Sequence, residues 1–456
     1  MYWNGRYAET EGADESAVGW LSAVEDAGVE DVESAEKLAL AAYQSGAFET
    51  AQRWIKRAPG SPLAQWLQAK LWLRAGKIGP AASLLAKLSH SFPLEPTGTN
   101  TPASLIDNLV VPFSEGCRED HGVGTQVLGE LGVLRLHRHQ YAESLDALLR
   151  SGFWMDAAYV AERVLTLDEL KAYVDDYWPA AEAGTNEVAM TDTPPTVSPR
   201  RLREDTRYLL ARRLARASRG AEAREYYPPQ WRPKFDELMA RLTPGWDDAQ
   251  PANLRASELF AGACIARTNG LELLGTEVGP DWFIHRGDFE YGVTVEVRTN
   301  DSFKILGASP DELRRAFGHH ADPEVRWHYR YQAAFLAWEA AKLMPNDCEE
   351  TAFVLWTAGD WLKNRDPVTA DGFYKTLVRR CRRTEIGAEA DRIRWFPQLD
   401  VNRRVIPRES KPDEGSPQIF PSDELLAADA AADTMELQTF EEPAEVQTET
   451  RADGEP

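Results

Sequence analysis

Cysteine is scarce in this sequence: 456 residues contain four, at Cys117, Cys264, Cys348 and Cys381. They form no CxxC pair and no Cys/His ligand pattern, so a zinc-binding module is excluded. We expect reduced, mostly buried thiols.

Long apolar runs are also lacking. None approaches the roughly 18 residues that a membrane-spanning helix needs, and the opening MYWNGRYAET has no signal-peptide pattern. We therefore expect no transmembrane segment.

Positive charge is low, with 51 basic against 73 acidic residues and a formal net charge of −22. Half of this charge lies in residues 411–456, where 13 acidic and 2 basic residues give −11. The remaining body is mildly acidic, which argues against general nucleic-acid binding because phosphate contacts need a positive surface. The Pro-, Glu- and Ala-rich composition of residues 403–456 predicts a disordered acidic tail.

Motifs of common enzyme classes are also lacking. The sequence contains no phosphate loop, zincin helix, nucleophile elbow or dinucleotide fingerprint. The nearest approach, HGVGTQVLGELG from His121, has Val127 where a third glycine is needed, and no strand precedes it. We therefore predict no cofactor, no metal and no catalytic residue, and we do not expect an enzyme.

The sequence does contain a repeat. Two helix–turn–helix units in Lys37–Leu88 place a small residue, a glycine, an aromatic or aliphatic residue and an alanine at one spacing. The matching positions are Ala39, Gly46, Phe48 and Ala51 in the first unit, and Ala69, Gly76, Ile78 and Ala81 in the second. Small residues at the crossing would let the two helices of each unit approach closely. Such repeats are typical of proteins that present a binding surface.

Weaker copies of this spacing occur elsewhere. They are His139, Tyr141 and Ser144, then Gly152, Trp154 and Ala157, and at the start Gly5, Tyr7 and Thr10. The last copy predicts that the sequence begins inside a longer gene product. The compartment stays open: the chain as it stands reads as soluble and cytoplasmic, and as exported if a missing N-terminus carries a signal peptide.

We predict an all-α fold, an irregular α-solenoid of stacked antiparallel helix hairpins with a small β-hairpin insertion. The expected regions are repeats over residues 1–178, a flexible linker over 179–199, helical hairpins over 200–270, the insertion over 271–308, C-terminal repeats over 309–402 and the tail over 403–456. The insertion is predicted from Phe289–Val297, where apolar residues alternate strictly with polar or small ones. Trp282–Arg286 is the expected partner strand.

Several helix starts carry capping signals. Ser309 to Glu312 resembles a capping box with proline at the first helical position. Asp322-Pro323 and Asp366-Pro367 each predict the start of a helix. Asn346 with Glu349 is expected to cap the helix between them.

The two clear hairpins resemble tetratricopeptide repeats, although their turn glycines are 30 residues apart against a family period of 34. About a third of the chain shows this resemblance. The segments Asp156–Val174 and Arg365–Gly387 resemble uncharacterised bacterial proteins with tetratricopeptide-like folds, some of them exported. The resemblance implies a fold and a bacterial source, and it supplies no activity.

Two segments are candidates for partner binding. Trp282, His285 and Arg286 bring aromatic area, a titratable ring and a guanidinium group into the insertion, although aromatic residues there could equally fill a corner between helices. Eight arginines lie between positions 200 and 219, among them Arg212 and Arg216. A solvated helix face explains such a run; the alternative is an anionic partner, such as the acidic tail.

The histidines give a weaker signal. His319, His320 and His328 could converge on a metal with Asp322, but the spacing matches no common ligand pattern, so we do not predict a site there.

The sequence therefore predicts a non-enzymatic scaffold that binds a protein or peptide partner, in an oligomeric state that the sequence leaves open. The alternative is a solenoid with a small-molecule or hydrolytic site in the insertion around Trp282–Asp288. A deep, dry site that joins His285 to Asp281 or Asp288 would favour the alternative.

Overall fold

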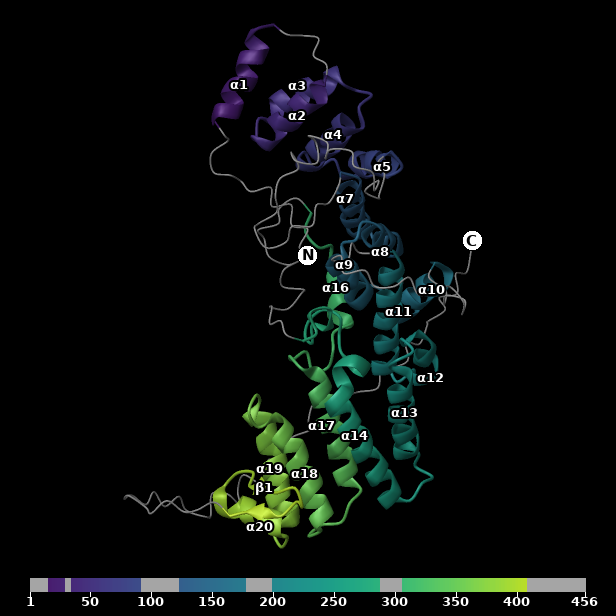
Figure 1. Cartoon of the computed structure of the whole chain (residues 1–456), viewed down its shortest axis with the longest axis vertical. Helices are drawn as coiled ribbons and strands as arrows, with labels where there is room; N and C mark the ends of the chain where they lie inside the picture. Colours follow the sequence, from purple (N-terminus) through teal and green to yellow (C-terminus); the bar gives the residue numbers. More distant parts are fainter. Residues whose placement is uncertain (1–14, 29–33, 92–122, 178–198, 288–305, 408–456) are drawn as a thin grey trace, which may run out of the picture. The chain divides into compact units, whose positions relative to one another are not determined.

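A computed structural model of the chain describes residues 15–28, 34–91, 123–177, 199–287 and 306–407. The chain divides into two units after Val405, and the described helices all lie in the first unit. Helices make up most of the described residues, which confirms the predicted all-α class (Figure 1). In the described ranges no helix has both the length and the apolar character to cross a membrane.

The N-terminal part of the fold is a succession of short helices. They are α1 (Glu15–Asp26), α2 (Ala35–Gln44), α3 (Phe48–Arg57), α4 (Pro62–Arg74), α5 (Ile78–Leu88), α7 (Val123–His137), α8 (Tyr141–Arg150), α9 (Trp154–Tyr159), a π-helical turn η1 (Val160–Val164) and α10 (Leu167–Tyr177). Neighbours in the chain pack on each other, as α2 on α3, α4 on α5 and α7 on α8.

Longer helices follow. They are α11 (Pro199–Arg216), α12 (Gly220–Ala223), the 3-10 turn η2 (Arg224–Tyr226), α13 (Arg232–Trp246), α14 (Ala252–Leu274), the 3-10 turn η3 (Phe283–His285), α16 (Pro310–Gly318), α17 (His328–Lys342), α18 (Glu349–Leu362), α19 (Pro367–Cys381) and α20 (Glu385–Ile393). The helix α14 packs on both α13 and α17, and α18 packs on α17 and α19 (Figure 1).

One turn geometry closes five of the helix hairpins. The second residue after the helix has a left-handed backbone in each, with φ between 58° and 76°; these residues are Gly46, Gly76, His139, Gly152 and Ser218. The next amide then donates to the carbonyl five residues earlier, at 2.8–3.1 Å in all five turns. This is the hydrogen bond of a Schellman helix end, which glycine adopts without steric cost. The repeat seen in the sequence is therefore a repeat of structure.

The small residues of the repeat lie where the helices cross. Ala39, Ala51, Ala69 and Ala81 are all fully buried. Each leaves room for the facing helix, so the two helices of a hairpin approach closely. The packed helix pairs support a helical-repeat architecture.

Three apolar clusters form the core of the described residues. The first fills α1 to α5 and one side of α7, the second runs from α7 to α16, and the third lies among α14 and α17 to α20. A buried polar contact joins two repeats of the first cluster. Lys70 forms an ion pair with Glu130, and the indole of Trp66 donates to the same carboxylate at 2.8 Å. Burial lowers the pKa of Lys70, and the Glu130 charge opposes this shift.

Two of the predicted helix caps are confirmed. The Ser309 hydroxyl accepts from the Glu312 amide at 3.1 Å, and Asp366 accepts from the Thr369 amide at 2.9 Å. The Glu312 side chain accepts from the hydroxyl of Tyr159 at 3.1 Å, which ties α16 to α9.

The N-termini of two other helices, α17 and α18, differ from the prediction. The helix α17 begins at His328 with Trp327 as its left-handed N-cap, so residues 322–327 precede the helix instead of opening it. The N-cap of α18 is Cys348. Asn346, the expected cap, accepts from Arg380 Nε at 2.7 Å because it faces the end of α19.

The small β-hairpin lies elsewhere than expected. Strand β1 (Gln398–Leu399) pairs with β2 (Val405–Ile406), after the last helix. The predicted strand Phe289–Val297 lies outside the described residues. The acidic segment 411–456 also lies outside them.

Candidate functional site

The loop after α14 is compact and helical where a strand was predicted. Phe283–His285 forms a 3-10 turn, and Trp282 and Arg286 flank it with left-handed backbones, at φ 53° and 54°. The amide of Phe283 donates back to the carbonyl of Thr276 at 3.0 Å, so the chain folds on itself instead of extending. The prediction of a strand over Trp282–Arg286 is therefore wrong.

Side chains close the same loop from within. The Thr276 hydroxyl donates to the carbonyl of Val278 at 2.7 Å and accepts from the Asp281 amide at 2.9 Å. Asp281 in turn accepts from the Thr276 amide at 3.2 Å. These bonds satisfy buried polar groups locally and hold Asp281 fully buried.

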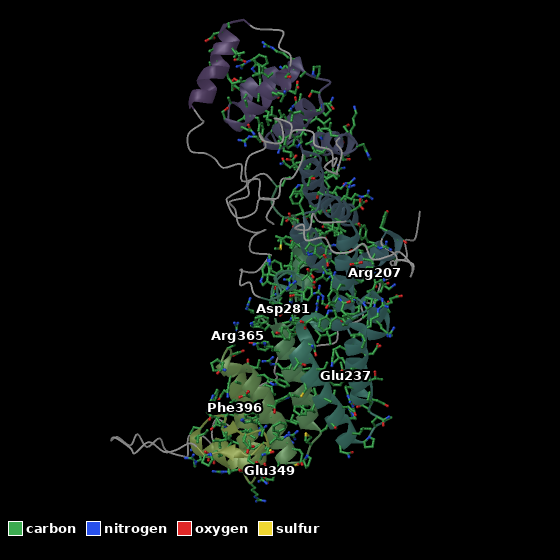
Figure 2. All side chains as sticks on the ribbon, in the orientation of Figure 1. Arg207, Glu237, Asp281, Glu349, Arg365 and Phe396 are labelled. Carbon is green, nitrogen blue, oxygen red and sulfur yellow. The ribbon has the colours of Figure 1, made fainter. Side chains whose placement is uncertain are left out.

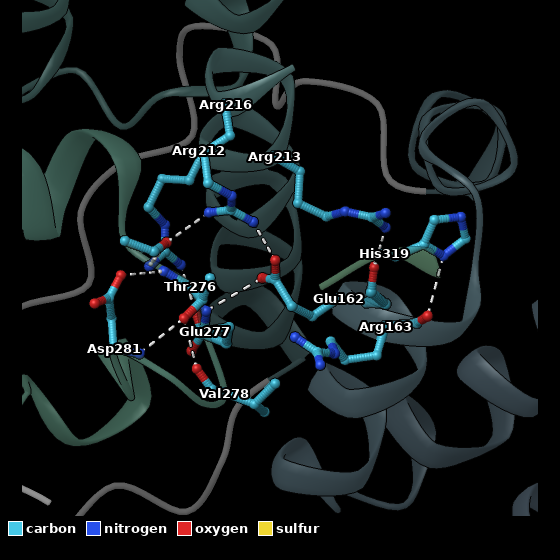
Figure 3. A network of polar contacts seen from close by, with 12 residues as sticks. Glu162, Arg163, Arg212, Arg213, Arg216, Thr276, Glu277, Val278, Asp281 and His319 are labelled. Carbon is cyan, nitrogen blue, oxygen red and sulfur yellow. Dashed lines mark hydrogen bonds and ion pairs between the residues drawn. The ribbon is translucent and has the colours of Figure 1, made fainter. Parts of the chain in front are cut away.

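Buried ion pairs fix this loop to α11 and to η1 (Figure 3). Arg212 pairs with Glu277 and Arg216 pairs with Glu162. The Glu162 carboxylate also accepts from the Glu277 amide at 3.1 Å. The indole of Trp154 donates to the Glu277 carboxylate at 3.1 Å. We call Glu162, Arg212, Arg216 and Glu277 the ion-pair network. It joins segments that lie more than 100 residues apart in the chain.

The two arginines also hold the end of α14. Arg216 Nη1 donates to the carbonyls of Leu274 and Gly275, at 3.0 and 2.9 Å, and Arg212 Nη1 donates to Gly275 at 3.3 Å. The last carbonyls of a helix lack partners within the helix and carry partial negative charge. The arginines therefore satisfy and stabilise this helix end while their carboxylate partners neutralise them.

Burial and charge act against each other in the network. Burial alone would raise the pKa of Glu162, but the positive charges of Arg216, Arg213 and Arg212 and the Glu277 amide hold it below its ordinary value. For Glu277 burial dominates, so its pKa is raised although Arg212 opposes the shift. The pKa of Arg212 is raised because the Glu277 charge outweighs burial.

An arginine and a histidine extend the network toward α16. Arg213 donates to the carbonyl of Leu165 at 3.0 Å and to that of Ala161, and burial lowers its pKa to about 10. His319 Nδ1 contacts the carbonyl of Arg163 at 3.0 Å. Burial, and then the Arg213 charge, lowers the pKa of His319.

The expectation of a solvated arginine face is wrong for the end of α11. Arg212 and Arg213 are buried, and Arg216 is mostly buried. The sequence carried a signal for this: apolar residues surround the helix at Tyr208 to Ala211 and again at Leu214. A helix that is apolar on nearly all sides is buried, and its charges must find partners inside.

A second buried contact joins the loop to the start of α17. Asp281 Oδ2 contacts His328 Nδ1, and both side chains are at most 1% exposed. Within the described part of the chain, His328 Nε2 and Asp281 Oδ1 are buried and have no hydrogen-bond partner. The imidazole in contact with Asp281 is therefore that of His328, whereas the sequence analysis had named His285 as the ring whose contact with Asp281 or Asp288 would favour a hydrolytic site.

The three histidines considered for a metal lie on separate partners. His319 contacts the Arg163 carbonyl, His320 contacts the Ala321 carbonyl, and His328 contacts Asp281. Among the described residues, no group of three or more His, Cys, Asp or Glu side chains is placed to hold a metal ion.

Beside His328, several arginines surround one tryptophan. The guanidinium carbons of Arg326, Arg330 and Arg365 lie 4.4, 4.7 and 5.7 Å from the ring centroid of Trp327. Arg326 also donates to the carbonyl of Gly287 at 2.7 Å, which joins this group to the loop. We call Trp327 and these three arginines the arginine–tryptophan cluster. Asp281 and Arg365 are labelled in Figure 2.

The structure brings the predicted site residues into one neighbourhood with different roles. Trp282 is buried in the second apolar cluster, and His285 is half-buried with its ring 6.4 Å from that of Trp282. Arg286 is exposed. The guanidinium carbon of Arg212 lies 3.7 Å from the ring centroid of Phe283, so α11 and the loop meet.

The sequence analysis missed Trp327 and its arginines as site candidates, although the stretch from Arg326 to Arg330 is visibly rich in arginine and aromatic residues.

Comparisons with known proteins give no relative. No protein family, no curated protein and no solved structure matches the chain.

Proposed function

We propose that the chain is a non-enzymatic scaffold of the tetratricopeptide-like class, which binds a peptide segment or a partner subunit. The observation that carries this proposal is the turn geometry shared by five helix hairpins. A fold built by repeating one unit exposes an extended surface, and repeat proteins use such surfaces for binding.

The loop and the arginine–tryptophan cluster are the part of this surface that we assign to the partner. The ion-pair network holds the loop from inside, so the loop offers a preformed shape and little ordering entropy is lost on binding. Arg286 and Arg365 are exposed there, and Trp327 is half-buried. Tryptophan and arginine are the residues most enriched in the energetic centres of protein interfaces.

Affinity capture tests the proposal. The full-length chain would be cross-linked in a lysate of the producing cells, and adducts would be mapped by mass spectrometry. Arg286→Glu is compared with Arg392→Glu, whose arginine is an exposed residue of α20 paired with Glu389. We expect one partner protein with the wild type and with Arg392→Glu, and loss of that partner with Arg286→Glu. Equal capture by all three chains, or enrichment of no protein, would contradict the assignment.

The contact between Asp281 and His328 favours a second candidate, a hydrolytic or small-molecule site. A carboxylate on Nδ1 orients an imidazole so that Nε2 can accept a proton, as in nucleophilic hydrolases. A working general base must be reached by substrate. Carbethoxylation with diethyl pyrocarbonate, followed by peptide mapping, measures this access. Modification of His328 as fast as that of exposed His320 would support the second candidate, and protection of His328 would remove it.

A further inference from the structure

Three buried or mostly buried arginines in this fold are neutralised by glutamates, whereas two half-buried arginines are not. Arg163, Arg212 and Arg216 each pair with a glutamate. Arg267 on α14 and Arg330 on α17 differ. In the residues that the structure describes, neither guanidinium group forms an ion pair or a hydrogen bond, and the Nε atom of each is buried without an acceptor. We call these two residues the Arg267–Arg330 pair.

Close helix packing brings the pair together. Gly270 lies one turn after Arg267, and a Cβ atom there would come within 2.5 Å of the ring of Tyr329, the neighbour of Arg330. The helices α14 and α17 therefore touch at this point, with a glycine giving room for the ring. The charge of Arg330 acts on Arg267: burial first, and then Arg330, lowers the pKa of Arg267.

Two carboxylates of the described residues in this region, Asp360 and Asp366, are engaged elsewhere. Asp360 acts on Arg267 at a distance, but its carboxylate pairs with Lys363 at 2.5 Å. Asp366 accepts from Tyr331 at 3.1 Å and from Thr369 at 2.6 Å. Two like charges thus share a partly buried position without a bound counter-charge from the described residues.

A third unpaired donor lies beside the pair. The indole nitrogen of Trp327 is buried and has no acceptor among the described residues, and Arg330 lies 4.7 Å from its ring centroid. Trp327 has a left-handed backbone, at φ 63°, which is strained for a residue other than glycine. Strained residues of this kind cluster at functional sites, where surrounding contacts hold them in place. Here Gly287 packs against the ring.

We infer that Arg267, Arg330 and the indole N–H of Trp327 form a binding site for an oxyanion, the phosphate or carboxylate group of a small ligand or of an acidic peptide. Guanidinium groups form strong charge-assisted hydrogen bonds with these groups. An oxyanion would neutralise the repelling charges and supply the acceptors that the three donors lack. The chain has a net charge of −22, so its overall field repels anions and any specific binding must arise locally. Arg330 and Trp327 also belong to the arginine–tryptophan cluster of the proposed partner surface, but binding of free phosphate does not require the scaffold role.

Calorimetry and thermal unfolding of the full-length chain test the site. Sodium phosphate and a hexaglutamate peptide are each compared with sodium chloride at equal ionic strength. The double variant Arg267→Gln/Arg330→Gln removes the two charges. The control is Arg241→Gln, which removes an exposed arginine of α13 that pairs with Glu258.

We expect phosphate or the peptide to bind the wild type and the control and to raise their Tm. In the double variant the affinity falls roughly tenfold or more, the loss of one or more charge-assisted hydrogen bonds. Binding of phosphate alone identifies a small phosphate ligand, and binding of the peptide alone identifies an acidic peptide.

The unfolding temperature in chloride shows whether the double variant is folded. In chloride the double variant should unfold at the wild-type Tm or above it, because a like-charge repulsion has been removed. If the double variant does not fold, Arg330→Lys keeps the charge and loses the planar fork, so its binding should be weaker than that of the wild type. Failure of both ligands to bind the wild type, or unchanged binding in the folded double variant or in Arg330→Lys, would overturn the inference.

Discussion

At the scale of single residues, the main feature is that buried charges hold the loop after α14. Taking charges out of water is costly, and a buried pair often adds little net stability compared with apolar residues of the same size. Removal of one partner is different because it leaves the other charge buried and unpaired. The ion-pair network therefore fixes the position of the loop more than it stabilises the fold.

Glu277→Ala tests this account. It leaves Arg212 buried without its carboxylate, so we expect the free energy of unfolding to fall by about 3–5 kcal/mol in urea titrations. Glu237→Ala is the matched control, because Glu237 pairs with Lys234 on the surface of α13 (Figure 2). Its expected cost is within about 1 kcal/mol. Similar small losses in both variants would show that the buried pair does not hold the loop.

His319 should make stability depend on pH. Its pKa is lowered from 6.5 in the folded chain, first by burial and then by Arg213, so below pH 6.5 the unfolded chain binds more protons than the folded one. Stability is therefore complete above pH 6.5 and falls as the pH drops toward the folded pKa. His319→Gln should flatten this part of the stability profile, measured by urea unfolding between pH 5 and pH 8. His320→Gln, at the exposed neighbouring position, should keep the wild-type slope; a slope equally steep in His319→Gln would refute the assignment.

At the scale of elements, the recurring unit is the helix end. The glycines of three turns were visible in the sequence, and their spacing predicted the hairpins. The copy of the spacing at His139 marked a fourth turn, and the structure adds Ser218 at the same left-handed position. Ser218 lacks the freedom that glycine has for this backbone, so its residue type did not mark the turn in the sequence.

Ser218→Gly should stabilise the fold. The left-handed backbone costs a serine roughly 1 kcal/mol that glycine does not lose, so we expect the free energy of unfolding to rise by about 0.5–1 kcal/mol. Ala217→Gly is the control, since this exposed neighbour lies outside the left-handed position. It should lose about 0.5–1 kcal/mol through backbone entropy. Destabilisation by both glycines would mean that residue 218 is not left-handed.

Gly287 links two elements and gives a test of their contact. A Cβ atom there would lie 2.6 Å from the Trp327 ring, on a backbone with φ +76°. Strain and overlap together should cost about 2–4 kcal/mol in Gly287→Ala. Gly76→Ala has the same kind of backbone, φ +71°, in open space, and strain alone should cost about 1–2 kcal/mol. Equal losses would show that the loop does not pack against Trp327.

At the scale of the whole molecule, periodic patterns were predictable and long-range partners were not. Helix spacing, turn glycines and the caps at Ser309 and Asp366 follow local rules. The inward position of Arg212 depends on Glu277, 65 residues away, and the Asp281–His328 contact spans 47 residues. Single-sequence patterns carry no information on such pairs. The start of α17 was misplaced because the Asp322-Pro323 cap signal is local, whereas Trp327 is held by the distant Gly287.

The central claim is that the loop around Arg286 presents a partner-binding surface on a helical-repeat scaffold. Site-specific photo-cross-linking tests it most directly, with benzoylphenylalanine placed at position 286 in the full-length chain in its producing cells. Position 177 is the control, because Tyr177 is 63% exposed at the end of α10. The account predicts one adduct of defined mass from position 286 and none from position 177. No adduct from position 286, or the same adducts from both positions, would contradict it.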